Sequence, residues 1–109
     1  MAQLTDRARA VAALRFRALG DETRLKLLEL LTDGERTVGY LMDATGLGQS
    51  LVSHHLRTLR QAGLVMTRRE GRWVHYSIVD AAIASVAWVV TDMEAPDAAR
   101  RAGPPAPTA

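Results

Sequence analysis

The sequence predicts a single, mainly α-helical domain of the α+β class, with five helices and one β-hairpin. Apolar residues recur at spacings of three and four along most of the chain, as at Leu25, Leu28 and Leu31, which is the period of an α-helix. Two β-prone runs instead flank Glu70-Gly71, a pattern typical of a hairpin. A chain of 109 residues has room for one small domain and not for two.

The first two helices are bounded by residues that commonly end helices. Residues 5–19 are expected to form the first helix, because Thr5 or Asp6 can accept a hydrogen bond from its first turn. The second helix is expected to begin after Asp21, a good N-cap residue, and to close at Gly34. Its leucines give the clearest helical repeat in the chain.

A helix-turn-helix pair is predicted next. Glu35–Thr37 is expected to be a short extended connection with one or two strand residues, after which Thr37 can cap a short third helix. Gly46–Gly63 is then expected to form a turn and a fourth helix. Two helices joined by three or four residues that include glycine have the geometry of a helix-turn-helix motif.

The fourth helix has two faces of different chemistry. One face is an apolar stripe at helical spacing, formed by Leu51, Val52, His55, Leu56 and Leu59. The opposite side, called the outer face below, comprises Gln49, Ser50, Ser53, His54 and Arg57. Surface helices usually carry long charges of both signs, whereas short hydroxyls, an amide and histidine allow close approach to base edges. The outer face is therefore either an ordinary solvated surface or a DNA-reading surface.

The hairpin is expected over residues 64–78. Its alternation puts Trp73, His75 and Ser77 on one face and Val74, Tyr76 and Ile78 on the other. Three arginines flank its tip, namely Arg68, Arg69 and Arg72. They can serve solubility alone. However, three arginines around one acid, directly after a polar helix face, also suit a wing that contacts phosphates or the minor groove.

Positive charge is concentrated in this same part of the chain. Between Arg36 and Tyr76 there are six arginines and two acidic residues, whereas the remainder has eight basic and ten acidic residues. The formal net charge of the whole chain is only +2. Such an asymmetry is what binding to a nucleic-acid backbone requires, and it favours the DNA-reading interpretation of the outer face.

The last helix is apolar nearly all round. It is expected over residues 81–93, with Asp80 as its N-cap. One small core cannot cover every face of such a helix, so a second copy of the chain is its natural partner, with the first helix packing alongside. The residues predicted to form this homodimer interface are Val11, Leu14, Ile83, Val86, Ala87 and Val90.

The end of the chain differs in composition. Residues 95–109 hold all four prolines, so a disordered tail is expected to follow a folded domain of residues 1–94. The chain contains no cysteine, which excludes disulfides and thiolate sites. No signal-peptide pattern is visible, and the longest nearly apolar run, Ala81–Val90, is too short to span a bilayer. We therefore expect a cytoplasmic protein that does not associate with membranes.

Three linked stretches of the sequence resemble the signature of the ArsR/SmtB winged-helix repressors. They are Leu-Gly-Asp-Glu-Thr-Arg-Leu-Lys-Leu-Leu at 19–28, Gln-Ser-Leu-Val-Ser-His-His-Leu at 49–56 with Leu-Arg-Gln-Ala-Gly-Leu-Val at 59–65, and the Gly71-Arg72…Tyr76 wing. The resemblance covers about residues 10–80. It implies a winged helix-turn-helix fold and a prokaryotic dimer that binds an inverted-repeat operator in double-stranded DNA. Such proteins usually repress, and they are released when an inducer, often a metal ion, binds.

The resemblance also implies roles for individual residues. The outer face would contact bases and phosphates, and the three arginines at the hairpin tip would act in the wing. His55 lies on the apolar stripe, where we expect a structural hydrogen bond rather than a base contact, and Arg24 is expected to brace the domain. The reading helices of a two-fold dimer should enter successive turns of the major groove, roughly 34 Å apart.

The metal ligands usual in this family are missing. One family site uses cysteines of the third helix, where this chain has Val-Gly-Tyr-Leu-Met-Asp at 38–43, and another uses Asp and His of the last helix, which here has no histidine. Soft-metal sensing is not expected, because those ions select thiolate. A nickel or zinc site would have to combine His54, His55 or His75 with carboxylates. His75 is the best single candidate, although a lone strand histidine is more often simply packed.

The inducer and the mode of regulation stay open. The alternatives are a metal at an unusual site, a small organic ligand between the first and last helices, a partner protein that does the sensing, or no ligand at all. A winged-helix module for protein–protein contact is a second class of function. An enzyme is not expected, because the sequence shows no recognisable nucleophile set, phosphate loop or metal cluster.

Overall fold

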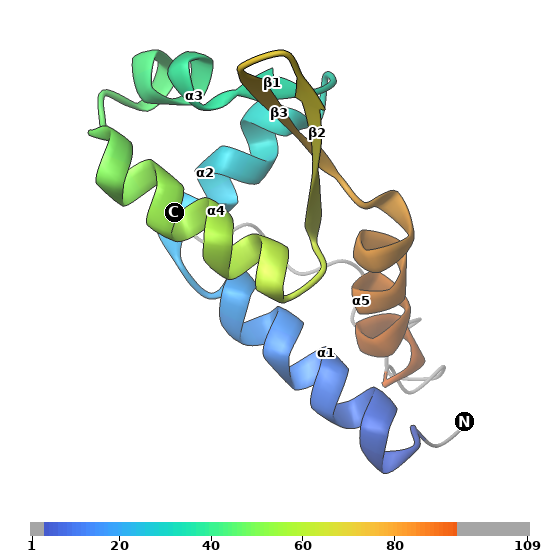
Figure 1. Ribbon diagram of the computed structural model, residues 1–109. Coiled ribbons are helices and arrows are strands. Elements are labelled where there is room, and N and C mark those ends of the chain that lie inside the picture. The colour runs from blue at the N-terminus through green and yellow to red at the C-terminus, as the bar shows by residue number, and fades with distance from the viewer. Residues whose placement is uncertain (1–3, 94–109) are drawn as a thin grey trace.

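The computed structural model describes residues 4–93, which form five helices and a three-stranded antiparallel sheet (Figure 1). The elements are α1 (Asp6–Leu19), α2 (Glu22–Leu31), β1 (Arg36–Thr37), α3 (Val38–Thr45), α4 (Gln49–Gln61), β2 (Val65–Glu70), β3 (Trp73–Ile78) and α5 (Asp80–Asp92). The predicted class and element order are confirmed. The predicted tail at 95–109 lies outside the described residues. Within residues 4–93, no helix is long and apolar enough to cross a membrane.

Three helices begin at side-chain caps. Thr5, Asp21 and Thr37 each accept a hydrogen bond of 3.0–3.2 Å from the backbone N–H three residues later. The sequence leaves Thr5 and Asp6 as alternatives for α1, and the structure selects Thr5. These caps set the starting points of α1, α2 and α3, and therefore the position of the helix-turn-helix unit that follows.

The prediction that Asp80 caps the last helix is wrong. Val79 occupies the N-cap position of α5, and Asp80 is the first helical residue. The reason lies in the backbone, because the Val79 N–H donates to the carbonyl of Leu64 at 2.9 Å and its carbonyl accepts from the Ala82 N–H at 3.0 Å. The chain thus turns directly from β3 into α5. The Asp80 carboxylate lies in the first turn, where it interacts favourably with the helix dipole.

The turn between α3 and α4 depends on one glycine. Gly46 has φ 73°, in the left-handed region, and its N–H donates to the carbonyl of Met42 at 2.8 Å, which ends α3. The largest fully buried side chains lie around this helix pair and are Leu27, Leu41, Val52, Leu56, Leu59 and Leu64. The core therefore holds α4 against both α2 and α3.

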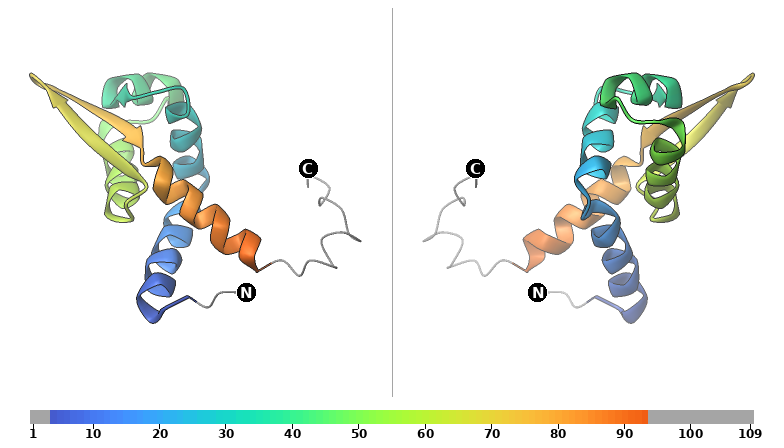
Figure 2. Two further views of the ribbon diagram at one scale, coloured as in Figure 1. Left: turned by 90° about the vertical axis from the view of Figure 1, so that its right-hand side faces the viewer. Right: turned by 90° about the vertical axis from the view of Figure 1, so that its left-hand side faces the viewer.

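The sheet has the order β1-β3-β2, with β3 in the middle. Glu70 pairs with Trp73 across a two-residue turn in which Gly71 has φ 60°. On its other edge β3 pairs with β1, where Arg36 lies opposite Tyr76. The hairpin of β2 and β3, called the wing below, projects from the body on the side of α4, whereas α5 extends the other way (Figure 2).

The buried stripe of α4 is narrower than predicted. Val52, His55, Leu56 and Leu59 are buried, but Leu51 is 44% exposed. Each helical residue advances by about 100°, which carries Leu51 to the edge of the stripe. Leu51 is therefore an apolar side chain at the border of the exposed surface of α4 rather than a core residue.

Candidate nucleic-acid interface

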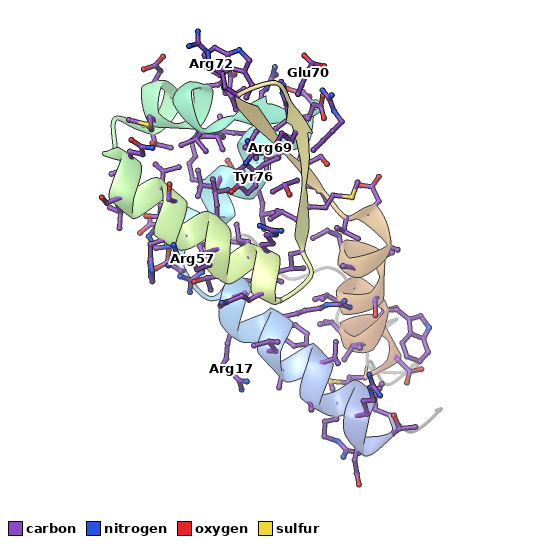
Figure 3. The ribbon with its side chains drawn as sticks, viewed as in Figure 1. Arg17, Arg57, Arg69, Glu70, Arg72 and Tyr76 are labelled. Carbon is purple, nitrogen blue, oxygen red and sulfur yellow. The ribbon has the colours of Figure 1, made fainter. Side chains whose placement is uncertain are left out.

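The outer face of α4 presents polar side chains to solvent. Gln49, Ser50, His54 and Arg57 are exposed, and Ser53 is half-buried. Figure 3 shows Arg57 on the side of α4 that faces away from the core. No acidic residue occurs anywhere in α4, so its own side chains do not repel a phosphate.

The N-terminal turn of α4 adds backbone donors to this face. Gly48 occupies the N-cap position and provides no side-chain acceptor, so the N–H groups of Gln49 and Ser50 have no side-chain cap. The same helix end carries the positive pole of the helix dipole. Both properties favour an anion such as a DNA phosphate at this end of the helix.

A hydrogen-bonded brace fixes α4 against the N-terminal helices. The Arg24 guanidinium on α2 donates through Nε to the carbonyl of Ala18 at 2.6 Å. Its Nη1 lies 3.1 Å from Nδ1 of His55, which is only 8% exposed. A guanidinium can only donate, so Nδ1 of His55 accepts and the ring proton resides on Nε2. The expected structural roles of His55 and Arg24 agree with this arrangement.

Asp21 completes the brace at the start of α2. Its carboxylate accepts from the Arg24 backbone N–H, and this hydrogen bond holds the pKa of Asp21 below its usual value. The carboxylate also lies 3.8 Å from Nδ1 of His55, which is too long for a hydrogen bond. Since Nδ1 already accepts from Arg24, we assign the Asp21 interaction to the cap and not to an ion pair with His55.

The wing carries three exposed arginines, of which Arg69 and Arg72 lie nearest to its tip. Arg69 and Arg72 are both exposed, and Figure 3 shows Arg72 with Glu70 at the far end of the hairpin and Arg69 further down the wing, towards Tyr76. The Arg72 guanidinium lies over the ring of Trp73, 5.4 Å from its centroid. These side chains can contact a phosphate or enter a minor groove without breaking a buried contact.

Arg68 differs from its two neighbours. Its guanidinium hydrogen-bonds both carboxylate oxygens of Glu35 and, at 3.0 Å, a carboxylate oxygen of Glu70. The two acids raise the pKa of Arg68, and the Arg68 hydrogen bond lowers the pKa of Glu35. The sequence predicts Arg68 as a DNA contact, but the structure places it between two acids that compensate its charge.

Sequence reasoning missed Glu35 as part of this surface. The basic segment begins at Arg36, so Glu35 falls just outside it. The pairing of β1 with β3, and of β3 with β2, brings Glu35 to Arg68 although 33 positions separate them. Glu35 lies in the predicted extended connection 35–37, but only the order of the strands shows that this connection runs beside Arg68.

Comparison with known proteins also indicates a DNA-binding regulator. The model of the bacterial regulatory protein family arsR matches residues 21–67. An uncharacterized helix-turn-helix transcriptional regulator of Methanocaldococcus jannaschii is 40% identical over 75% of this chain and 93% of its own length. A probable mercury resistance operon repressor of Streptomyces lividans is 40% identical over 77% of this chain and 67% of its own length. The chain belongs to the ArsR family of bacterial regulatory proteins.

A solved structure supports the fold of this ArsR-family protein. It is a homodimeric winged helix-turn-helix DNA-binding domain from Mycobacterium bovis, a possible ArsR-family transcriptional regulator. It shares 38% identity, covers 84% of this chain and 91% of its own, and has a TM-score of 0.67. The chain is therefore a transcriptional regulator with a winged helix-turn-helix domain and not an enzyme.

The histidines of this ArsR-family chain are not gathered into a metal centre. Nδ1 of His75 lies 3.9 Å from Glu35, whose carboxylate is already bound by Arg68. The rings of His54 and His55 lie edge to face with centroids 5.3 Å apart. Among residues 4–93 no group of three or more His, Cys, Asp or Glu could hold a metal ion. His75 stays a single candidate ligand, and the nickel or zinc site considered from the sequence gains no further residue.

The residues predicted for a dimer interface divide into two groups. Val11, Leu14, Ala87 and Val90 are exposed, as an interface requires, and Ile83 is half-buried. Val86 is only 8% exposed within a single chain and belongs to the core, so its place in the interface stays a prediction. α1 packs against α5, and Val86 faces this contact. Trp88, which is 51% exposed, instead adds to the apolar surface of α5.

Proposed function

We propose that this ArsR-family regulator is a homodimeric repressor that binds an inverted-repeat operator in double-stranded DNA, in the cytoplasm. One observation carries the proposal. α4 and the wing lie on the same side of the molecule, and α5 extends away from them (Figure 2), while the outer face of α4 and Arg69 and Arg72 of the wing are largely exposed. Each protomer can then present a polar, basic surface to DNA while its apolar helices contact a second protomer.

The outer face of α4 is proposed to enter the major groove. Gln49, Ser50 and His54 have short or planar polar groups that can donate to and accept from base edges. Arg57, one turn further along, can contact a guanine edge or a phosphate. A good bidentate contact of this kind discriminates against a wrong base by about 1–3 kcal/mol. Ser53 is half-buried, so only part of its side chain can take part.

The wing is proposed to contact the DNA backbone through Arg69 and Arg72. Both are exposed and lie beside the two-residue turn. Arg68 has a different role in this proposal, because it connects the wing to Glu35 just before β1 and so positions the hairpin. The wing would then contribute two arginines to DNA binding, with a third that holds their strand in place.

The exposed apolar surface of α1 and α5 is proposed to form the dimer interface. Val11, Leu14, Trp88 and Val90 are between 38% and 51% exposed, which is unusual for large apolar side chains gathered on two neighbouring helices. The related domain from Mycobacterium bovis is a homodimer. A two-fold dimer would place its two α4 helices at successive major grooves, roughly 34 Å apart.

An effector that changes operator affinity is also part of the proposal. The relatives include proteins named for mercury and arsenic resistance. Such soft ions select thiolate ligands, and this chain has no cysteine. The effector proposed for this chain therefore has a different chemistry from a soft metal ion.

The proposal is tested by selecting a preferred duplex from a random DNA library and measuring its affinity by fluorescence anisotropy. We expect the selected duplex to contain an inverted repeat and to bind at least about 1,000-fold more tightly than a shuffled duplex at physiological salt. Light scattering of the free protein should give the mass of a dimer. Equal affinity for both duplexes would contradict sequence-specific binding, and a monomeric mass at micromolar concentration would contradict the dimer.

A further inference from the structure

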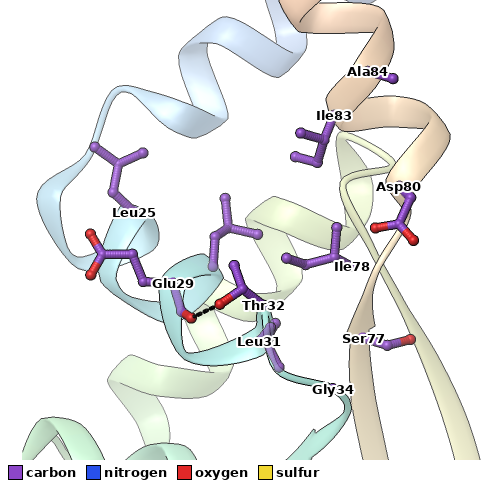
Figure 4. A pocket seen from close by; sticks show the side chains of 11 residues that line it. Leu25, Glu29, Leu31, Thr32, Gly34, Ser77, Ile78, Asp80, Ile83 and Ala84 are labelled. Atoms are coloured by element: carbon purple, nitrogen blue, oxygen red, sulfur yellow. Dashed lines mark hydrogen bonds between the residues drawn. The ribbon is translucent and has the colours of Figure 1, made fainter.

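A cavity of about 710 Å³ opens between α2, β3 and α5, outside the proposed DNA interface (Figure 4). Its walls are mainly apolar, with Leu25 and Leu28 from α2, Ile78 from the end of β3 and Ile83 from α5. The volume falls in the range of about 300–1,000 Å³ that is usual for small-molecule sites. The cavity is thus large enough for an organic ligand of several rings.

The charged groups that line this cavity are all acidic. Glu29 on α2 and Asp80 on α5 lie on opposite sides of it (Figure 4), and no Lys, Arg or His is among its lining residues. The hydroxyl of Thr32 donates to the carbonyl of Glu29 at 2.7 Å, so its proton is already used within the protein. Lys26 approaches Glu29 only to 3.9 Å, and both side chains are exposed, so this pair is weak. The two carboxylates are therefore available to a positive ligand.

We propose that this cavity binds a bulky, apolar organic cation, such as a phosphonium, a quaternary ammonium or a protonated amine, as the effector of the regulator. The apolar walls would take the hydrophobic groups, and the two carboxylates would attract the charge. The ligand-binding part stands on the cavity alone. The effector part rests on the proposed function, because it requires an operator to be released.

The proposed dimer surface leaves this cavity open. Val11 and Trp88 lie on a different hollow, between α1 and α5, and neither lines the cavity between α2 and α5. Leu14 and Val90 do not line it either. Ile83, which is half-buried, is the one predicted interface residue that also lines the cavity, so a second protomer seated on Val11, Leu14, Trp88 and Val90 would border the cavity without filling it. A small molecule is the occupant that its size and its acidic groups favour.

The cavity is connected to both parts of the DNA interface. Ser77 and Ile78 line it at the end of β3, and the same strand forms half of the wing. Leu25 lines it on α2, directly after Arg24, whose guanidinium reaches His55 of α4. Leu28 and Leu31 belong to both the cavity wall and the buried core. A ligand that separates α2 from α5 would therefore shift the wing relative to α4, and it would bind the released form more tightly than the DNA-bound form.

The ligand site is tested first, without DNA, by isothermal calorimetry with two probes of the same shape and opposite charge. These probes are tetraphenylphosphonium and tetraphenylborate. We expect the cation to bind about tenfold more tightly, because two exposed carboxylates each add a modest attraction. Equal binding of the two probes, or no binding of the cation, would overturn the proposal.

Two pairs of substitutions locate the site. The double variant Glu29→Gln with Asp80→Asn should abolish the preference for the cation and leave the binding of tetraphenylborate equal or stronger. The matched double variant Glu22→Gln with Asp43→Asn removes the same charge at exposed positions that do not line the cavity, and should keep the preference. Ala84→Trp at the cavity edge should block both probes while circular dichroism stays unchanged. A cation preference that survives in the first double variant would place the probe elsewhere and contradict the proposal.

The effector part is tested with the selected operator. Saturating tetraphenylphosphonium should lower operator affinity at least fivefold in the unsubstituted protein and leave the Glu29→Gln, Asp80→Asn variant unchanged. Unchanged affinity in the unsubstituted protein would overturn the effector role. The proposed function and the proposed ligand site can be contradicted separately. If the protein binds the cation but prefers no duplex, the proposed function is wrong. If the protein binds a specific operator but does not bind the cation, the proposed ligand site is wrong.

Discussion

α4 and α5 have the same length but opposite exposed surfaces. Each has 13 residues and buries one face in the same core, with Val52 and Leu56 in α4 and Ala82 and Val86 in α5. The other side of α4 carries hydroxyl, amide, imidazole and guanidinium groups, whereas the other side of α5 carries Trp88 and Val90. The buried faces determine how each helix packs in the core and do not distinguish the two helices by partner. The exposed faces carry the proposed partners, which are nucleic acid for α4 and the apolar surface of a second protomer for α5.

The largest expected effect is the loss of dimerisation when a charge is placed on the exposed face of α5. Val90→Asp should raise the dissociation constant of the dimer roughly 100-fold, or about 3 kcal/mol, because it places an unpaired carboxylate in an apolar interface. Sedimentation velocity over a dilution series measures the change. Leu25→Asp is the control, since Leu25 is similarly exposed but lies on α2. Unchanged dimerisation of the Val90 variant would remove α5 from the interface.

The next effect concerns the wing. The double variant Arg69→Ala with Arg72→Ala should reduce the slope of log affinity against log salt by about four, since the dimer loses two arginines from each wing and each phosphate contact contributes about one. Anisotropy titrations of the selected operator between low and physiological salt give this slope. Arg68→Ala should change the slope less, because Glu35 and Glu70 already compensate its charge. Equal changes for all three arginines would show that Arg68 contacts DNA directly.

A smaller effect is expected on the α4 side. Arg57→Ala should weaken operator binding about 30-fold, because each protomer of the dimer loses one arginine that contacts a base, at a cost of about 1 kcal/mol or more for each. It should leave dimerisation unchanged, because Arg57 is exposed on the outer face. Arg9→Ala is the control, since Arg9 pairs with Asp6 on α1, which is not part of the proposed DNA-binding surface. If the two variants bound DNA alike, Arg57 would not be part of the reading surface.

The smallest effect is a pH dependence of stability. The hydrogen bond from Arg68 lowers the pKa of Glu35 below its ordinary value of 4.5, so the ionised carboxylate stabilises the folded state. This stability is fully present above pH 4.5 and is lost as the pH falls through the lowered pKa of the folded state. Urea unfolding at several pH values should show Glu35→Gln with a shallower loss of stability in acid. A parallel loss in both proteins would mean that the Arg68 pair does not persist in solution.

The local elements were predictable from the sequence, and the contacts between distant elements were not. Caps such as Thr37 and turns such as Gly46 depend on neighbouring residues, so their chemistry is visible in the sequence. Val86 shows the limit, because a helix that is apolar all round gives no sign of which face enters the core and which meets a partner. Arg68 shows the same limit for charge, since its partner Glu35 lies 33 positions away.

The cavity between α2 and α5 illustrates the point most clearly. Leu25, Glu29 and Asp80 are ordinary surface positions when α2 and α5 are considered separately. They line one cavity only because β3 ends close to α2, so that α5 begins on the opposite wall of the same cavity. The small organic ligand considered from the sequence was placed between the first and last helices, whereas the larger of these two cavities lies against the second helix.

The direct passage from β3 into α5 at Val79 has a consequence for a dimer on its operator. A single residue connects the strand of the wing to the helix proposed to join the protomers, so the two elements cannot rotate independently. When one wing binds its half-site, the orientation of its own α5 changes with it, and so does the orientation of the partner's α5 packed against it. The second half-site would then be bound by a protomer already in the matching orientation, which makes cooperative occupation of the two half-sites an expected property of this fold.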